Sequence, residues 1–197
     1  MQDELPLEPG DSELEGAIES ILLVAGGPVS VRNLAGTLGQ PLKRVNEALK
    51  SLQAKLDSGI RLQVDRSEAQ LVTAPEYAEV VRNFLGSAKP APLSRAALEV
   101  LAVVAYHQPV TRSEIEAARG VNSDRTVQTL LARELIEEHG HRDTPGRPME
   151  YITGFRFLET FGLRSLEDLP PLPKESIEQV ELTRLGLRAS MVGQPDE

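Results

Sequence analysis

The stretches PVSVRNLAGTLG at residues 28–39 and PVTRSEIEAARG at residues 109–120 decide the fold that we expect. One offset of 81 residues aligns matching residue types, namely Pro28 with Pro109, Val29 with Val110, Ser30 with Thr111, Leu34 with Ile115, Gly39 with Gly120 and Leu49 with Leu130. A constant register through a turn, a helix cap and a helix stop indicates an internal repeat. We therefore expect two copies of one small fold.

The first copy extends to both sides of its stretch. Apolar residues at helical spacing predict helices over residues 12–25, 30–38 and 41–56. Ser12 and Glu15 have the spacing of a capping box, which predicts the start of the first helix. Apolar residues that alternate with polar ones predict a hairpin over residues 60–73, and a last helix over 75–85 is expected to pack behind it.

The second copy repeats this order. Ser94 is the expected cap of its first helix, and Thr111 with Glu114 has the capping-box spacing of the second. The third helix is expected to begin at Ser123 or Asp124. The apolar stripe of the first helix is expected at Leu98, Leu101, Ala102 and Ala105. Strands are expected over residues 135–141 and 149–153, with Thr144-Pro145-Gly146 at the hairpin tip.

Three helices followed by a hairpin form the winged helix-turn-helix layout. We therefore expect a mainly helical α+β chain with small hairpins, made of two tandem winged helix-turn-helix domains and a Pro-rich C-terminal tail. The expected parts are a disordered acidic N-terminus at 1–10, a first domain at 11–86, a linker at 87–93, a second domain at 94–163 and a flexible tail at 164–197. Two prolines make the linker semi-rigid.

Composition excludes several classes of protein. The chain has no cysteine, so disulfides, thiolate metal sites and cysteine nucleophiles are absent. No stretch approaches the roughly 20 apolar residues of a membrane span, and the N-terminus lacks the basic region of a signal peptide. We expect a cytoplasmic protein with no membrane contact. The net charge is -9, and neither half is basic, which disfavours DNA as the main partner.

No pattern of a catalytic or cofactor site is present. The sequence has no nucleophile elbow, metalloprotease motif or phosphate-binding loop. Glu137, His139, His141 and Asp143 alternate on one strand face, but only neighbours on a strand could share a metal ion, and two ligands fall short of the usual three or four. We expect a non-enzymatic protein without metal, cofactor or small-molecule substrate.

The second copy carries specific motifs. They include Ala97-Leu98-Glu99, Gln108-Pro109, Glu114-Ile115-Glu116, Arg119-Gly120-Val121-Asn122-Ser123-Asp124, Thr144-Pro145-Gly146-Arg147-Pro148 and Ser165-Leu166-Glu167-Asp168-Leu169-Pro170-Pro171-Leu172-Pro173. These motifs resemble the bacterial segregation and condensation protein B family, the accessory subunit of bacterial condensin. The first copy matches more loosely, through Ile18-Glu19-Ser20-Ile21-Leu22 and Gly27-Pro28-Val29-Ser30. The resemblance covers about residues 12–173, and His107 departs from the basic residue usual in the family.

The resemblance implies partners and a role. Members are homodimers with two winged-helix domains, and they bind the kleisin subunit, segregation and condensation protein A. Through the kleisin they work with the structural-maintenance-of-chromosomes ATPase in chromosome condensation and segregation. The resemblance therefore implies a nucleoid-associated subunit of the condensin complex.

Two surfaces are candidate interfaces. The first domain is expected to dimerise through its apolar run Ile21, Leu22, Leu23 and Val24. The second is expected to bind the kleisin through Gln108, Arg112, Arg119, Arg147 and Tyr151, because arginine and tyrosine dominate interface energetics. Local roles remain open alternatives: Arg112 and Arg119 could pair with Glu114 or Glu116, and Tyr151 could lie in the core.

The rival interpretation is a winged-helix DNA-binding transcriptional regulator. The third helix of the first domain carries four basic residues, Lys43, Arg44, Lys50 and Lys55, against Glu47 and Asp57. In the second domain Arg125 and Arg133 are balanced by Asp124 and Glu134. Duplex affinity rises with the number of phosphates neutralised, so a locally neutral helix binds poorly. We expect at most weak DNA contact, through the first domain.

Overall fold

The computed structural model describes residues 10–172. Contacts divide the chain into two compact units. Among the described residues, the first unit comprises residues 10–90 together with Leu158–Asp168, and the second comprises Ala91–Phe157 with residues 169–172. The expectations for residues 1–9 and 173–197 lie outside the described residues. Within residues 10–172, none of the helices combines the length and the apolar character that crossing a membrane would require.

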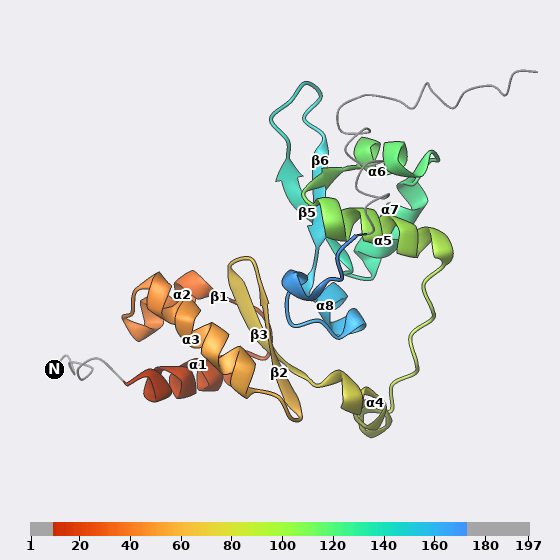
Figure 1. Ribbon diagram of the computed structural model, residues 1–197. Helices are drawn as coiled ribbons and strands as arrows, with labels where there is room; N and C mark the ends of the chain where they lie inside the picture. The colour runs from red at the N-terminus through yellow and green to blue at the C-terminus, as the bar shows by residue number, and fades with distance from the viewer. Residues whose placement is uncertain (1–9, 173–197) are drawn as a thin grey trace, which may run out of the picture. The chain divides into compact units, whose positions relative to one another are not determined.

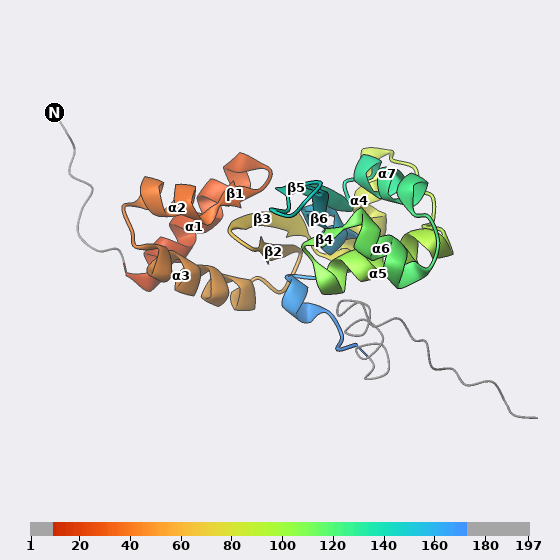
Figure 2. The same cartoon turned by 90° about the horizontal axis from the view of Figure 1, so that it is seen from above.

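In the first unit, the three helices within residues 11–55 gather on one side of a small antiparallel sheet (Figures 1 and 2). The elements of this unit up to Pro90 are α1 (Asp11–Ala25), β1 (Val29–Ser30), α2 (Val31–Leu38), α3 (Leu42–Lys55), β2 (Ile60–Asp65), β3 (Glu68–Thr73), a 3-10 turn (Pro75–Tyr77) and α4 (Ala78–Leu85). The strand order is β1-β3-β2, with Leu62 opposite Leu71. The core is mainly aliphatic and is formed by Leu14, Ile18, Leu22, Val31, Leu34, Ala35, Val45, Ala48, Leu49, Leu52, Leu62 and Ala69.

Local signals set most helix ends, with one exception. The Ser30 hydroxyl accepts a hydrogen bond from Asn33 N–H at 3.1 Å, and Gly39 ends α2 with φ 61°, as expected. The expected cap at Ser12 is wrong. Helix α1 begins one residue earlier, where Gly10 N–H donates to the Glu13 carboxylate at 3.1 Å. Glu15 is instead buried and forms an ion pair with Lys55 of α3.

Helix α4 does not pack as the sequence suggested. It has no buried residue, whereas we expected it to cover the back of the hairpin. Phe84 is 88% exposed and Val80 is 67% exposed. An apolar stripe at helical spacing predicts that a helix is amphipathic, but it does not say which surface covers the stripe.

The first unit is completed by a segment that follows the second unit in sequence, Leu158–Asp168, which we call the returning segment. Val64 N–H, on the edge strand β2, donates to the Arg164 carbonyl at 2.9 Å. The buried Gln63 amide donates to the Leu163 carbonyl at 2.8 Å. The buried Gln70 amide donates to Gln63 at 3.0 Å and to Glu159 at 3.2 Å. Buried amides need such partners, so the segment and the sheet depend on each other.

Arg164, within the returning segment, contacts the end of α3 and the loop after it. Its guanidinium donates to the Gln53 carbonyl at 3.0 Å and forms an ion pair with Asp57. The expected boundaries placed residues 158–163 with the second domain and the residues from 164 in a flexible tail. The difference arises because the partners of this segment lie about a hundred residues earlier in the sequence. Patterns that extend over a few residues cannot predict contacts between residues so far apart in the sequence.

The second unit has the same order of elements. They are α5 (Arg95–His107), β4 (Val110–Thr111), α6 (Arg112–Arg119), α7 (Asp124–Ala132), β5 (Ile136–His141) and β6 (Met149–Thr153). Helix α8 (Phe155–Phe161) leads into the returning segment, which ends in a 3-10 turn (Leu166–Asp168). The strand order is β4-β6-β5, which matches β1-β3-β2. The bounds of β4 and α6 follow those of β1 and α2 by the predicted 81 residues, and the expected α+β class is confirmed.

The buried face of α5 differs from the expected stripe. Leu101 and Ala105 are buried as expected, but Leu98 is 45% exposed and Ala102 is also exposed. Val100 and Val104 are fully buried in their place. Because this helix is apolar on nearly every side, helical spacing alone could not choose between the possible stripes.

Candidate functional site

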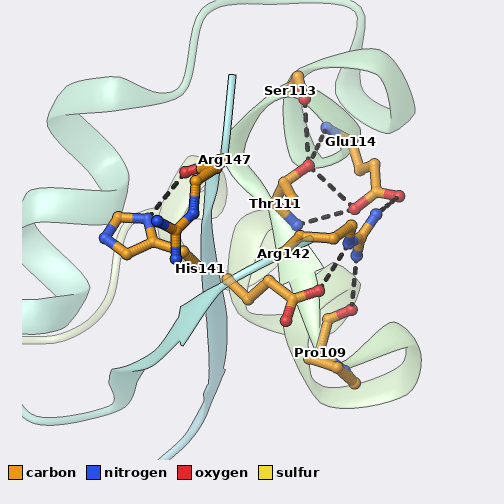
Figure 3. A network of polar contacts seen from close by, with 8 residues as sticks. Pro109, Thr111, Ser113, Glu114, His141, Arg142 and Arg147 are labelled. Carbon is orange, nitrogen blue, oxygen red and sulfur yellow. Dashed lines mark hydrogen bonds and ion pairs between the residues drawn. The ribbon is translucent and has the colours of Figure 1, made fainter. Parts of the chain in front are cut away.

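The guanidinium of Arg142, which directly follows β5, is a centre of polar contacts in the second unit (Figure 3). Nε donates to Glu150 Oε1 of β6 at 2.6 Å, and Nη1 donates to Glu114 Oε1 of α6 at 2.7 Å. Nη2 donates to the Pro109 carbonyl at 3.2 Å. One side chain therefore joins the hairpin to the junction between α5 and α6.

The acceptor Glu114 is itself held by the predicted capping box. Thr111 N–H donates to Glu114 Oε2 at 2.8 Å, and Glu114 N–H donates back to Thr111 Oγ1 at 3.4 Å (Figure 3). Burial acts to raise the pKa of Glu114, but the hydrogen bonds from Arg142 and Thr111 outweigh it and leave the pKa lowered. The hydrogen bonds from Arg142 to Glu114 and to Glu150 raise the pKa of Arg142. The hairpin is thus fixed by a charged network and not by the strand ladder alone.

The sequence patterns did not predict a role for Arg142. The alternation of Glu137, His139 and His141 pointed to one face of β5, and Arg142 lies just after these residues. Its N–H donates to the Pro148 carbonyl at 2.9 Å, so it closes the hairpin ladder. An arginine just before a Pro-Gly turn is a weak signal, because its partner Glu114 is 28 residues away.

Gln108 serves the scaffold. Its Oε1 accepts hydrogen bonds from Thr153 N–H at 2.8 Å and from Thr153 Oγ1 at 3.1 Å. Its amide nitrogen donates to the Ala105 carbonyl at 3.3 Å. The side chain thereby joins the end of α5 to β6.

Arg112 and Tyr151 lie together beside α6. Arg112 Nη1 donates to Asp124 Oδ1 of α7 at 2.6 Å, and both side chains are about half exposed. This hydrogen bond is the main cause that raises the pKa of Arg112. Tyr151 on β6 is buried, and burial raises its pKa. Arg112 therefore keeps an accessible guanidinium, whereas Tyr151 contributes to the core.

Arg119 is an internal residue. Its side chain is 9% exposed, and it donates to Ser123 Oγ at 2.7 Å and to Glu99 Oε2 of α5 at 3.1 Å. Neither Arg112 nor Arg119 pairs with Glu114 or Glu116, which had been the open local alternatives. Glu116 instead accepts hydrogen bonds from Asn122 and Ser123.

Arg147 lies at the hairpin tip and is exposed. Its φ of 39° is in the left-handed region, and its carbonyl is bonded to His141 Nδ1 at 2.8 Å. Within residues 10–172 its guanidinium has no hydrogen bond or ion pair (Figure 3). Of the five predicted partner residues, Arg112 and Arg147 are accessible, and Gln108, Arg119 and Tyr151 support the surface that carries them.

The predicted dimerisation run divides in two. Leu22 is 1% exposed and belongs to the core, and Ile21 packs partly against that core. Leu23 and Val24 are 66% and 87% exposed at the end of α1. Only these two side chains remain available to a second chain.

The charges of α3 are mostly paired. Lys43 lies 4.0 Å from Glu47, Arg44 lies 3.6 Å from Asp11, and Lys55 pairs with Glu15. Within the described chain Lys50 has no such partner. Across residues 10–172, no three His, Asp or Glu side chains are placed to share a metal ion.

Comparisons with known proteins identify relatives of this chain. A family model described as "Segregation and condensation complex subunit ScpB" matches residues 16–172. "Segregation and condensation protein B" of Moorella thermoacetica is 43% identical over 196 residues, covering 98% of this chain and all of that protein. The protein of the same name from Syntrophotalea carbinolica is 46% identical over 175 residues, covering 87% of this chain and 86% of that one. The crystal structure of ScpB from Mycobacterium tuberculosis shares 41% identity, with a TM-score of 0.39, over 80% of this chain and 99% of that one.

The network around Glu114 predicts an acid-dependent contribution to stability. A lowered pKa in the folded state stabilises the fold above the ordinary value of 4.5, and this contribution is lost as the pH falls through the folded pKa. Glu114→Gln should lower the free energy of unfolding at pH 7 by about 1 kcal/mol, a modest value because the side chain is more than a third exposed. Urea unfolding at pH 7 and pH 3 measures the effect.

The difference between Glu114→Gln and the unmodified chain should shrink at pH 3. The matched control is Glu79→Gln on α4, an exposed glutamate without a hydrogen bond in the described chain. It should leave the free energy of unfolding within about 0.5 kcal/mol of the unmodified value. An equal loss at both pH values for Glu114→Gln would contradict the proposed charge network.

Proposed function

The chain belongs to the segregation and condensation complex subunit ScpB family, and on that premise we propose that it is a non-enzymatic subunit of the condensin complex. Its role is chromosome condensation and segregation. Two relatives whose matches cover 98% and 83% of this chain carry the name segregation and condensation protein B, which supports this role.

Each unit is proposed to be a winged-helix domain. The support is the shared order of helix, short strand, two helices and hairpin, with the same strand order in both sheets. In both copies the second helix ends at a glycine with positive φ, Gly39 and Gly120. The proposed domains are residues 11–86 with the returning segment, and residues 94–157, joined by the linker at 87–93.

The second unit is proposed to bind the kleisin subunit. The observation that carries this proposal is the hairpin held by Arg142 in three directions, which presents the unpaired Arg147 at its tip. A side chain on a rigid support loses less conformational entropy on binding. The accessible Arg112 lies on the same unit, beside Tyr151. The structural-maintenance-of-chromosomes ATPase is then engaged through the kleisin, which would bring this cytoplasmic protein to the nucleoid.

A DNA-binding transcriptional regulator has less support. The basic residues of α3 are paired with carboxylates except for Lys50, and α7 contributes only Arg125 as an unpaired cation within the described chain. Each paired cation must lose its carboxylate before it can neutralise a phosphate. Protein partners are therefore favoured over duplex DNA.

The kleisin proposal predicts a graded response to arginine truncation. Arg112→Ala and Arg147→Ala should each weaken binding of the kleisin from the same genome by about 2 kcal/mol, because accessible charged contacts would be lost. Arg119→Ala should mainly lower the free energy of unfolding, since its guanidinium joins α5 to α6. Isothermal titration calorimetry and urea unfolding measure the two effects.

The matched control for this titration is Arg125→Ala, which removes an exposed and unpaired arginine from α7 of the same unit. It should bind the kleisin like the unmodified chain. If Arg112→Ala and Arg147→Ala also bind with unchanged affinity while remaining folded, the kleisin occupies another surface.

The first unit is proposed to form the homodimer through α1. Leu23 and Val24 are the exposed half of the predicted run, and exposed apolar pairs of this kind are suited to interfaces. The double substitution Leu23→Ser and Val24→Ser should convert a dimer to a monomer without lowering stability, because neither side chain is in the core. Light scattering at micromolar concentration measures the mass.

The control for dimerisation is Val121→Ser, which removes an exposed valine from the second unit, 54% exposed before α7. It should leave the dimer intact. A monomeric unmodified chain would contradict the homodimer itself, whereas a dimer that survives the α1 substitutions would place the interface elsewhere on the molecule.

A further inference from the structure

Strand β5 forms an edge of the second sheet. The strand order β4-β6-β5 leaves one side of β5 without a neighbouring strand. Every residue from Glu137 to His141 is exposed. Backbone groups on the open side of an edge strand lack ladder partners, so such an edge can accept another strand.

The edge of the equivalent strand in the first unit is covered. There the edge strand β2 meets the returning segment, through Val64 N–H and the Arg164 carbonyl at 2.9 Å. The Gln63 amide adds a second contact, to the Leu163 carbonyl at 2.8 Å. Within residues 10–172, no backbone hydrogen bond to a residue outside the sheet covers Glu138 or His139 in the same way. Within the described residues, the two copies thus differ at this edge, which is covered in the first and open in the second.

A β-bulge divides the open edge. The ladder with β6 is regular from Ile136 to Glu138, where Glu138 lies opposite Tyr151, and it shifts between Glu138 and Gly140. Bulges and charges on an edge discourage pairing between identical sheets. The regular stretch before the bulge is the part that could accept a strand.

The negative charge of Glu138 favours some pairing strands over others. Glu138 is exposed, and its carboxylate makes no hydrogen bond or ion pair in the described chain. A second copy that paired in the register with Glu138 opposite Glu138 would bring two carboxylates together, and like charges across a strand pair are destabilising. A segment with a lysine or arginine at that place would instead gain an opposite-charge pair. The edge is therefore suited to a basic partner and unsuited to its own copy.

We propose that the open edge of β5, at Ile136–Glu138, accepts an extended segment of the partner protein by backbone pairing, with a basic side chain beside Glu138. This inference rests on the proposed kleisin binding, and it adds the mode and the chemistry of that contact. Backbone pairing supplies affinity without regard to sequence, and the Glu138 carboxylate supplies the choice of segment.

Amide hydrogen exchange of the full-length chain tests the pairing, with the kleisin from the same genome as the probe. The amide of Glu138, within the proposed stretch, should exchange at least about ten-fold more slowly in the complex, because a new backbone hydrogen bond would protect it. Glu138→Lys should weaken kleisin binding about five-fold, since an opposite-charge pair becomes a like-charge pair. The matched control is Glu79→Lys on α4, also exposed and unpaired in the described chain, which should bind like the unmodified protein.

The outcomes separate the two proposals. Absence of any kleisin binding contradicts the proposed function. Binding without protection of β5, and with full affinity for Glu138→Lys, overturns the edge inference and leaves the proposed function standing. Protection of β5 that depends on the chain's own concentration, without the kleisin, would assign the edge to a second copy and also overturn the inference.

Discussion

The guanidinium of Arg142 holds the hairpin of the second unit against the junction of α5 and α6, and Arg164 holds the returning segment of the first unit in a comparable way. Each arginine reaches across elements that no strand ladder joins, and each finds both a carboxylate and a backbone carbonyl. Guanidinium groups suit this work because their donors are arranged in a fixed fork. A chain poor in aromatic residues thus gains rigidity from polar contacts around aliphatic cores.

These internal contacts constrain function as well as shape. An arginine that is already bonded to a carboxylate is not available to a phosphate. In the second unit Arg119 and Arg142 are used in this way, and among residues 10–172 Arg147 finds no partner for its guanidinium, on a support that Arg142 holds in place. The same constraint leaves Lys50 as the unpaired cation of α3. The proposed use of the fold, protein recognition with little attraction for duplex DNA, follows from where the cations are bound.

Local sequence patterns predicted the repeat, most helix limits and both hairpins, because caps, glycine stops and alternation act over a few residues. Ser30 and the Thr111–Glu114 pair behaved as their spacing predicted. Contacts between distant residues were not predictable in this way. No periodic pattern in the sequence indicates the contact of Gln63 with Leu163 or that of Arg142 with Glu114. For the candidate site, the sequence named Arg112 and Arg147, which are accessible and whose binding role stays a prediction, and it did not point to Arg142, which holds the hairpin that carries Arg147.

The central claim is that internal pairing of the cations suits this chain to protein partners and not to duplex DNA. Fluorescence anisotropy with a labelled DNA duplex tests it most directly, over a range of salt concentrations. The account predicts no submicromolar binding at physiological ionic strength, because few phosphates could be neutralised. Tight binding that falls steeply with added salt, and that is lost in Lys50→Ala or Arg125→Ala, would contradict it.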